Sequence, residues 1–479
     1  MIHELPLQGL VEHRVALTET DRALRPSLRK VATRARGWFN DRSHSSLAQR
    51  MAGAAFLVRV ASAGLMYLTQ VLLARWMGSY EFGIYIYVWT WVLLVGGLFD
   101  FGLAQSAQRF IPEYTERRRR DLLRGFLSGS RWLAAGASTV FALIAIAAVY
   151  LLRDWLDHYL VIPLLLACLC LPFYALSGVQ DGIGRSYNWL MVGLAPPYIL
   201  RPILLILIMA GAYGGGLPID STTAMIAAVG ATWLTAMVQL LLLNRQLGIE
   251  VERGRKEYEV KTWLATSVPI LLVESFYLML TYTDVLLLKH FRSPEEIAVY
   301  YAAAKTLALV AFVNFAVSAA VAHRFTEYHM SGDRERLSAF LRDSIRWTFY
   351  PSLAATALIL LLGKPFLWLF GPEFLSGYPV MFVLAIGLLA RAAVGPVERL
   401  LNMLGEQNIC AAVYATAFAI NLTGCIVLIP KFGGLGAAIA TSSALIIESI
   451  LLFIVTKRRL GLHVFIWRRT PAPKPNPVP

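Results

Sequence analysis

Charged residues and cysteines are both scarce in this chain. Of its 479 residues, 15% are charged and 57% hydrophobic, and the mean hydropathy is +0.58. Soluble domains carry about 25% charged residues, so this composition excludes an ordinary soluble fold and indicates an integral membrane protein. The cysteines lie in apolar segments without the spacing of a zinc site or a disulfide scaffold: Cys168, Cys170, Cys410 and Cys425.

Enzyme signatures are also missing from the sequence. No GxxxxGK[ST] stretch is found, which excludes a built-in ATPase of that type. The histidines form no convincing metal constellation. We therefore expect a protein that is not an enzyme and has no cofactor.

Long apolar runs fill most of the chain instead. About 20 apolar residues suffice to cross the hydrocarbon core of a bilayer as a helix. Twelve segments meet this requirement and predict an all-α membrane protein with about 12 transmembrane helices: 53–73, 84–107, 132–152, 160–180, 190–211, 222–243, 264–288, 299–322, 348–369, 379–403, 409–429 and 434–455.

The distribution of Lys and Arg orients these segments. Of 44 such residues, 33 fall in the tails and the even-numbered loops, 5 in the other loops and 6 in the spans. The positive-inside rule then places both termini in the cytoplasm. The first apolar run begins after some 50 polar residues, so we expect no ordinary signal peptide. The topology explains the net charge of +14 without a nucleic-acid partner, and we predict a multi-pass membrane protein.

An internal repeat organises the chain. Arg109-Phe110 and Arg131-Trp132 recur 215 residues later, as Arg324-Phe325 and Arg346-Trp347. We therefore predict two homologous six-helix lobes at 51–243 and 263–456. A cytoplasmic linker at 244–262 joins them, a basic tail at 1–50 precedes them and a Pro-rich cytoplasmic tail at 457–479 follows.

A polar stripe runs down the first helix of the second lobe. Glu274, Tyr277, Thr281 and Asp284 are three, four and three residues apart, which places them on one helix face. Carboxylates at membrane depth bind protons or cations, so these four residues and Glu448 are candidates for coupling to H⁺ or Na⁺. A structural ion pair between Asp284 and Lys305 is the alternative for that carboxylate.

Cations inside the spans form a second group of candidates. We expect a central cavity with a surplus of positive charge, which suits an anionic ligand carrying phosphate. Arg59 is also near enough to a span end for its guanidinium to reach the headgroups, and that alternative stays open. The candidate substrate-binding residues are Arg59, Arg201, Lys305 and Arg391.

Two stretches resemble a known family. They are Leu72–Tyr114, punctuated by Gly78, Phe82-Gly83 and Asp100-Phe101-Gly102, and the set Asn402–Gly405, Asn421 and Leu428–Ser442. Both are similar to the polysaccharide flippase branch of the multidrug, oligosaccharidyl-lipid and polysaccharide exporter superfamily. The resemblance covers about residues 50 to 456 and implies two six-helix lobes around a cavity that opens alternately to either side.

The same resemblance implies a function and partners. Members of this branch move undecaprenyl-diphosphate-linked oligosaccharides to the outer leaflet, often with proton or sodium coupling. The resemblance therefore implies a location in the bacterial inner membrane. The expected partners are a lipid-linked anionic oligosaccharide, membrane lipid and polysaccharide polymerase machinery. A cation-coupled drug exporter of the same superfamily is an alternative. A membrane polysaccharide polymerase or ligase is a weaker one, because such enzymes generally need a sizeable outer loop.

Overall fold

The computed structural model is helical throughout its described part. It describes residues 44–330, 333–403 and 406–466, with side chains from residue 60 onward apart from a few, chiefly between 319 and 330. These ranges contain helices and no strand, as expected for an all-α membrane fold. Some predicted features lie outside these described ranges: nearly all of the tail at 1–50, the side chain of Arg59, and residues 467–479. Val60 onward forms one compact unit, to which the account below applies.

The helices follow the predicted order of spans. Their bounds are α2 (His44–Leu98), α3 (Leu103–Glu116), α4 (Arg120–Leu151), η1 (Arg153–Trp155), α5 (His158–Ser186), α6 (Leu190–Gly193), η2 (Pro196–Leu200), α7 (Arg201–Gly214), α8 (Ser221–Glu250), α9 (Val260–Phe291), α10 (Pro294–Leu307), η3 (Ala308–Val310), α11 (Ala311–Met330), α12 (Arg334–Leu361), α13 (Gly363–Phe370), η4 (Pro372–Gly377), α14 (Tyr378–Val394), α15 (Val397–Met403), α16 (Gln407–Phe432) and α17 (Gly434–Leu460).

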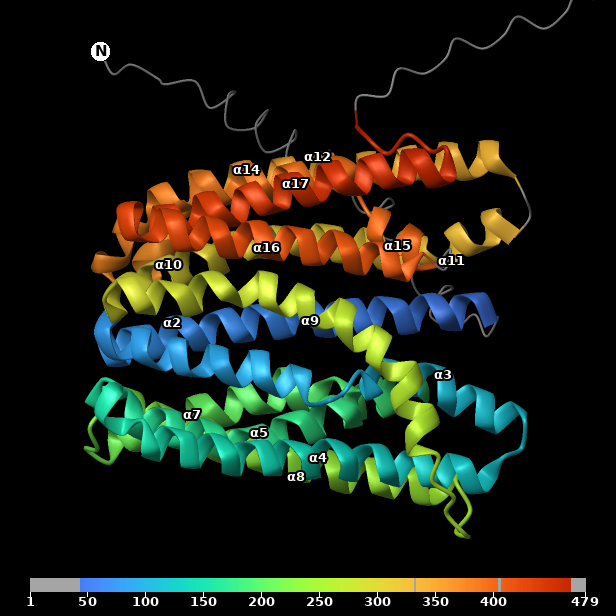
Figure 1. Cartoon of the computed structure of the whole chain (residues 1–479), viewed down its shortest axis with the longest axis horizontal. Helices are drawn as coiled ribbons and strands as arrows, with labels where there is room; N and C mark the ends of the chain where they lie inside the picture. The colour runs from blue at the N-terminus through green and yellow to red at the C-terminus, as the bar shows by residue number, and fades with distance from the viewer. Residues whose placement is uncertain (1–43, 331–332, 404–405, 467–479) are drawn as a thin grey trace, which may run out of the picture. The chain divides into compact units, whose positions relative to one another are not determined.

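The described helices contain 10 candidate membrane spans, or up to 11 when α12 and α13, bent by 61°, count as one. One candidate, Val60–Glu116, is 57 residues long, which is several times the thickness of a bilayer at 1.5 Å per residue. Gly78 breaks it with φ 75° and ψ 170°, and Figure 1 shows the chain reversing direction within α2. Counting this stretch as two crossings reconciles eleven spans with the expected twelve.

One predicted span is wrong at its end. The segment 379–403 does not form one helix, because α14 stops at Val394 and the shorter α15 begins at Val397. Gly395 adopts φ 67°, a conformation that favours glycine, and Pro396 lacks the N–H needed to continue a helix. The break places α15 beside the cavity described below.

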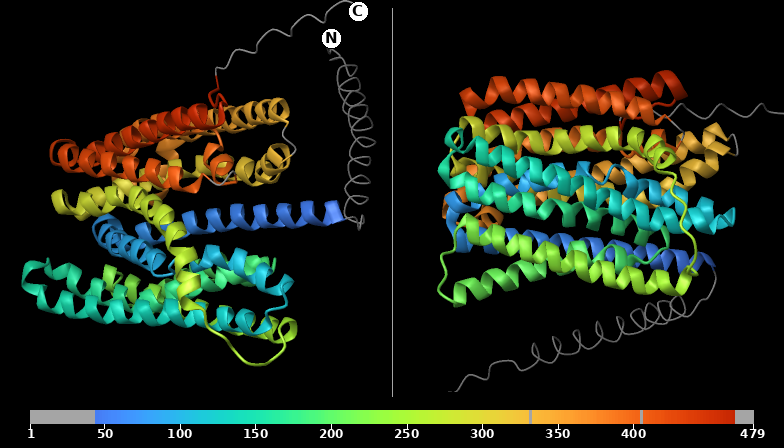
Figure 2. Two further views of the ribbon diagram at one scale, coloured as in Figure 1. Left: turned by 45° about the vertical axis from the view of Figure 1, so that its right-hand side comes forward. Right: turned by 60° about the horizontal axis from the view of Figure 1, so that its bottom comes forward.

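The helices group into two bundles that follow the two halves of the sequence. In the first half α4 packs on α5, and α5 on α3 and α8; in the second α17 packs on α14 and α16. Figures 1 and 2 show these groups from three directions, with α2 and α9 between them. The start of α9 packs on α3, where Ser267 and Ser106 hydroxyls are 2.6 Å apart, whereas its remainder packs on α16.

The two halves also contact each other at one end of the helices, which we call the Asp157 end. Lys289 Nζ at the end of α9 donates to Asp157 Oδ2 at 2.6 Å, and this hydrogen bond lowers the pKa of Asp157. The Gly83 backbone lies so close to Pro294 that a Cβ there would be 1.8 Å from the Pro294 carbonyl oxygen. Contacts between the halves therefore close this end. When the pH falls through the lowered pKa of Asp157, its carboxylate takes up a proton and its contact with Lys289 weakens.

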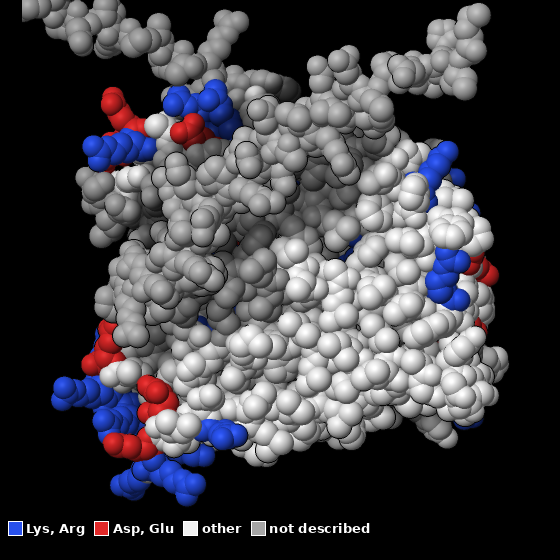
Figure 3. All heavy atoms as spheres, turned by 180° about the vertical axis from the view of Figure 1, so that it is seen from behind, with Lys and Arg blue, Asp and Glu red and all other residues white. Residues whose placement is uncertain are grey.

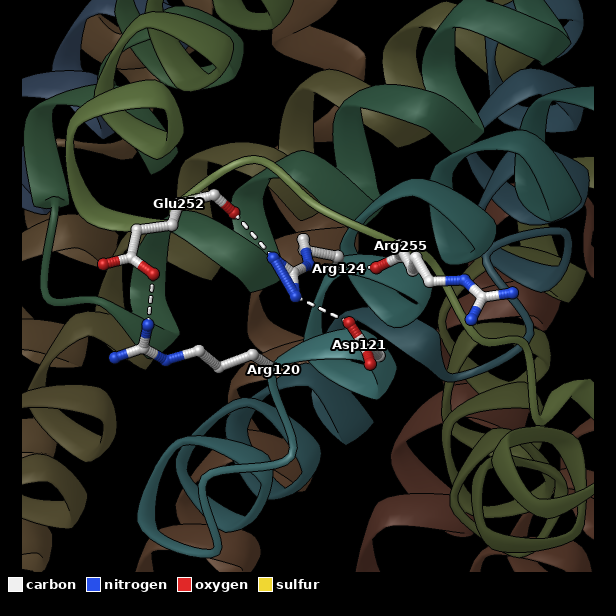
Figure 4. A network of polar contacts seen from close by, with 5 residues as sticks. All are labelled: Arg120, Asp121, Arg124, Glu252 and Arg255. Carbon is white, nitrogen blue, oxygen red and sulfur yellow. Dashed lines mark hydrogen bonds and ion pairs between the residues drawn. The ribbon is translucent and has the colours of Figure 1, made fainter.

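The linker between the halves is held at the opposite end, which we call the Arg120 end. Arg124 donates to the carbonyl oxygens of Glu252 at 2.9 Å and Arg255 at 3.0 Å, and to Asp121 at 2.6 Å (Figure 4). Arg120 pairs with the Glu252 carboxylate. Since α8 and α9 extend into the predicted linker, only a short extended segment around 251–259 remains, and it lies along the start of α4.

Charged side chains at the described surface lie mainly away from its middle. On the face in Figure 3 they gather mainly towards the two ends of the helices, and the described atoms between these ends are mostly uncharged. This is the distribution that a bilayer requires of a multi-pass protein.

The contact between α3 and α5 yields a test of this packing. A Cβ at Gly182 would lie 2.2 Å from the Ala104 carbonyl oxygen, so Gly182→Ala should lower the free energy of unfolding by about 1–3 kcal/mol through overpacking. Thermal unfolding in detergent measures the effect. Gly136→Ala on α4 is the control, because no atom lies within 4 Å of its added Cβ; equal stability of the two variants would contradict the packing.

Candidate functional site

Two adjoining chambers lie within the second half of the chain. The larger, of about 370 Å³, lies towards the Arg120 end and is lined by residues of α9, α11, α12, α14, α15, α16 and α17. The smaller, of about 230 Å³, lies towards the Asp157 end. Tyr277 and Arg391 line both chambers, so they stand where the two meet.

Arg391 is held between two carboxylates at this junction. It lies in the last turn of α14, ahead of the break at Gly395. Its Nε is 3.5 Å from Glu448 Oε1, and its Nη2 is 3.6 Å from Glu398 Oε2. The Glu448 side chain is 0% exposed, and its carboxylate oxygens have no hydrogen-bond partner among the described residues. Tyr277 lies beneath the guanidinium, with its ring centroid 5.8 Å from Cζ.

The charge of the larger chamber differs from the expected cationic surplus. Its lining includes two guanidinium groups, from Arg391 and Arg399, and three carboxylates, from Glu274, Glu398 and Glu448. With all five ionised, the formal charge is −1. An uninterrupted helix over the predicted span 379–403 would place Glu398 near the end of that span, whereas the break after α14 turns it into the chamber.

Asp284 lies in the smaller chamber and does not pair with Lys305. It is 6% exposed, and its Oδ2 accepts from Tyr300 Oη at 2.5 Å and from Thr441 Oγ1 at 3.3 Å. Among the described ion pairs none joins Asp284 to Lys305. Lys305 lies over the Tyr301 ring at 5.1 Å from its centroid, so the alternative of an ion pair is wrong in this conformation.

Arg201 lies in a different cavity in the first half. That cavity is about 30 Å³ in volume, and its lining includes no carboxylate. The guanidinium carbon is 5.3 Å and 5.6 Å from the ring centroids of Tyr174 and Trp89. The preceding turns, η2, are a π-helix at the prolines Pro196 and Pro197, a type of irregularity that often occurs at functional sites.

The polar stripe on α9 is thus divided between the two chambers. Glu274 lines the larger, Thr281 and Asp284 the smaller, and Tyr277 both. Thr281 Oγ1 donates to the Tyr277 carbonyl oxygen at 2.8 Å. The repeat counterparts of Thr281 and Asp284, Met66 and Thr69, line the cavity of Arg201, so both first helices turn this face towards a cavity in their own half.

Three residues of these chambers were missed by the sequence reasoning. Tyr300 and Thr441 hold Asp284, and Glu398 contacts Arg391. The Gly395-Pro396 dipeptide is a turn signal that could have indicated a break within the predicted span 379–403, ahead of Glu398. No comparable local signal marks Tyr300 or Thr441, because their roles depend on packing between helices.

Comparisons with known proteins agree with this architecture. The sequence profile of the family described as polysaccharide biosynthesis protein matches residues 50–329, and the MatE profile matches residues 269–427. An uncharacterized membrane protein of Methanocaldococcus jannaschii is 23% identical over 406 residues, covering 79% of this chain and 78% of that protein.

Solved transporter structures share the fold. The lipid II flippase MurJ superposes with a TM-score of 0.68 at 17% identity, over 84% of this chain and 87% of its own. A multidrug resistance MATE family transporter of the MOP superfamily superposes with a TM-score of 0.66 at 14% sequence identity, over 85% of this chain and 94% of its own. A transporter of that superfamily from Pyrococcus furiosus is described as having a binding pocket of reversed polarity. It superposes with a TM-score of 0.62 at 14% sequence identity, over 86% of this chain and 95% of its own.

The contact between Tyr300 and Asp284 can be tested directly. Tyr300→Phe should lower the free energy of unfolding by about 1.5–3 kcal/mol, because a buried carboxylate loses a hydrogen-bond donor. Thermal unfolding in detergent is the measurement. Tyr301→Phe is the matched control, since its hydroxyl makes no described hydrogen bond to Asp284. Equal midpoints for the two variants would show that the Asp284 contact contributes nothing.

Proposed function

The chain belongs to the polysaccharide biosynthesis protein family of the multidrug, oligosaccharidyl-lipid and polysaccharide exporter superfamily, and we propose that it is a flippase for a lipid-linked oligosaccharide. In this proposal the substrate is an undecaprenyl-diphosphate-linked oligosaccharide. The protein moves it from the cytoplasmic to the outer leaflet of the bacterial inner membrane, for polysaccharide export.

The single observation that carries this proposal is the placement of arginines at membrane depth. Arg201 and Arg391 each lie within a transmembrane bundle and line a cavity. A guanidinium inside a transmembrane bundle is costly unless it has a partner or a function, and it can bind phosphate oxygens through paired N–H donors. A diphosphate headgroup is a substrate of matching charge.

The proposed cycle alternates the access of the cavities between the two membrane faces. The positive-inside rule places the Arg120 end in the cytoplasm and the Asp157 end outside. The contacts between the halves at the Asp157 end, including Lys289 with Asp157, then form the outer closure. We propose that they separate when the substrate headgroup leaves, while its lipid chain stays in the bilayer.

A drug exporter of the same superfamily is the second candidate. The three carboxylates of the larger chamber favour it, because its substrates are cations. In that alternative Glu274 and Glu448 exchange a proton or sodium ion for the drug. The two candidates differ in the sign of the ligand charge that the chambers prefer.

Deletion of the gene in its native host tests the proposed function. We expect a lipid-linked oligosaccharide to accumulate on the cytoplasmic leaflet, because its synthesis continues while its transfer stops. Chemical analysis of the lipid extract, with a membrane-impermeant probe to assign the leaflet, measures it. Unchanged lipid-linked intermediates together with increased sensitivity to cationic drugs would favour the second candidate.

The outer closure yields a second prediction. We expect a short thiol cross-linker between Cys residues at positions 157 and 289, introduced as Asp157→Cys and Lys289→Cys, to stop export, because it prevents the halves from separating. The four native cysteines are buried, so they should react little. Polymer export is measured before and after cleavage of a reducible linker.

The control places both cysteines within one half. Glu373→Cys and Ser376→Cys lie on η4 and are exposed, and linking them should leave export unchanged. Full export by the cross-linked 157–289 protein would contradict a cycle that requires this end to open.

A further inference from the structure

We infer that Arg391, Glu448 and Glu398 form a proton-gated anion site, in which a phosphate group takes the place of the carboxylates at Arg391 as these accept protons. The inference rests on the proposed function and concerns how its substrate binds. It addresses a conflict within the larger chamber, whose formal charge of −1 opposes an anionic substrate.

The geometry of Arg391 leaves its donors available. Its distances of 3.5 Å to Glu448 and 3.6 Å to Glu398 are longer than the 2.7–2.9 Å that is typical of a charge-assisted hydrogen bond. The carboxylates therefore neutralise the guanidinium without occupying its N–H groups in close hydrogen bonds. A ligand with oxygens at shorter range can displace them from Arg391.

Glu448 makes this exchange depend on a proton. Its side chain is 0% exposed, and Arg391 is its only described ion-pair partner. When a phosphate occupies Arg391, Glu448 would be a buried charge without compensation, which is strongly unfavourable. Uptake of a proton by Glu448 removes that charge, so anion binding and proton uptake are linked.

The other groups around the chamber reinforce this linkage. The titratable and charged residues that face it are Glu274 and Tyr277 of α9, Glu398 and Arg399 of α15, and Tyr414 of α16. The lining residues on α11 and α12 are uncharged, including Asn314, Ser318 and Ser352. Protonation of two of the three carboxylates changes the formal charge from −1 to +1. Proton and anion thus bind together, whereas in proton–drug exchange the proton and the cationic drug would compete for the carboxylates.

Farnesyl diphosphate is a suitable probe for this site, because it carries the proposed headgroup on a short isoprenoid chain. Its affinity for the purified full-length protein in detergent is measured by calorimetry from about pH 5.5 to about pH 8.5 at fixed sodium concentration. We expect wild-type affinity to fall as pH rises, by at most about tenfold per pH unit for each proton taken up.

Titration of the probe itself affects wild type and every variant equally. Differences in pH slope between the variants therefore report on the site. Glu448→Gln and Glu398→Gln imitate protonated carboxylates, so each should bind more tightly at high pH and with a shallower pH slope than wild type. Arg391→Gln should lose most of the binding at every pH. Glu373→Gln, on η4 outside the chamber, is the matched control and should follow wild type.

Several outcomes would overturn the inference. Parallel pH slopes in wild type and Glu398→Gln would overturn it, even if Glu448→Gln failed to fold. Wild-type affinity that increases with pH would also contradict it. Retained binding by Arg391→Gln would contradict the assignment of the anion to Arg391. Farnesol, which lacks the anion, should show no pH-dependent difference among the variants. These results are independent of the deletion experiment. If the lipid-linked intermediate accumulates but the affinity for the probe does not depend on pH, the proposed flippase function stands and the proton-gated site is rejected.

Discussion

The ion pair of Arg391 with the buried carboxylate of Glu448 is the constraint on which the site in the second half depends. Neither charge is stable alone at this depth, because removal of one partner from a buried pair costs about 3–5 kcal/mol. The fold meets the requirement by ending α14 at Val394 and turning α15 so that Glu398 also reaches Arg391. The cavity, the helix break and the carboxylates therefore form one arrangement.

The two halves of the chain differ in how their cavity charges are compensated. In the first, Arg201 lies among aromatic rings in a small cavity without a carboxylate. In the second, Arg391 is neutralised by carboxylates and lies between two larger chambers. The first helix of each half lines its own cavity. The charges of each half thus set what its cavity can bind.

Much of this was accessible from the sequence because a bilayer imposes simple rules. Apolar runs of sufficient length predicted the spans, and the repeat offset aligned Thr281 and Asp284 with Met66 and Thr69, which line corresponding cavities. The partners of the buried charges were harder to predict. Asp284 is held by Tyr300 and Thr441 instead of Lys305, since such contacts depend on helix rotation and packing, which hydropathy does not specify.

A double-mutant cycle on Arg391 and Glu448 tests the central claim most directly. The free energy of unfolding in detergent is measured for wild type, Arg391→Gln, Glu448→Gln and the double variant. If the pair is the constraint, Arg391→Gln alone should be strongly destabilising because it leaves Glu448 uncompensated, and the double variant should recover much of that loss. Additive losses in the double variant would contradict the account.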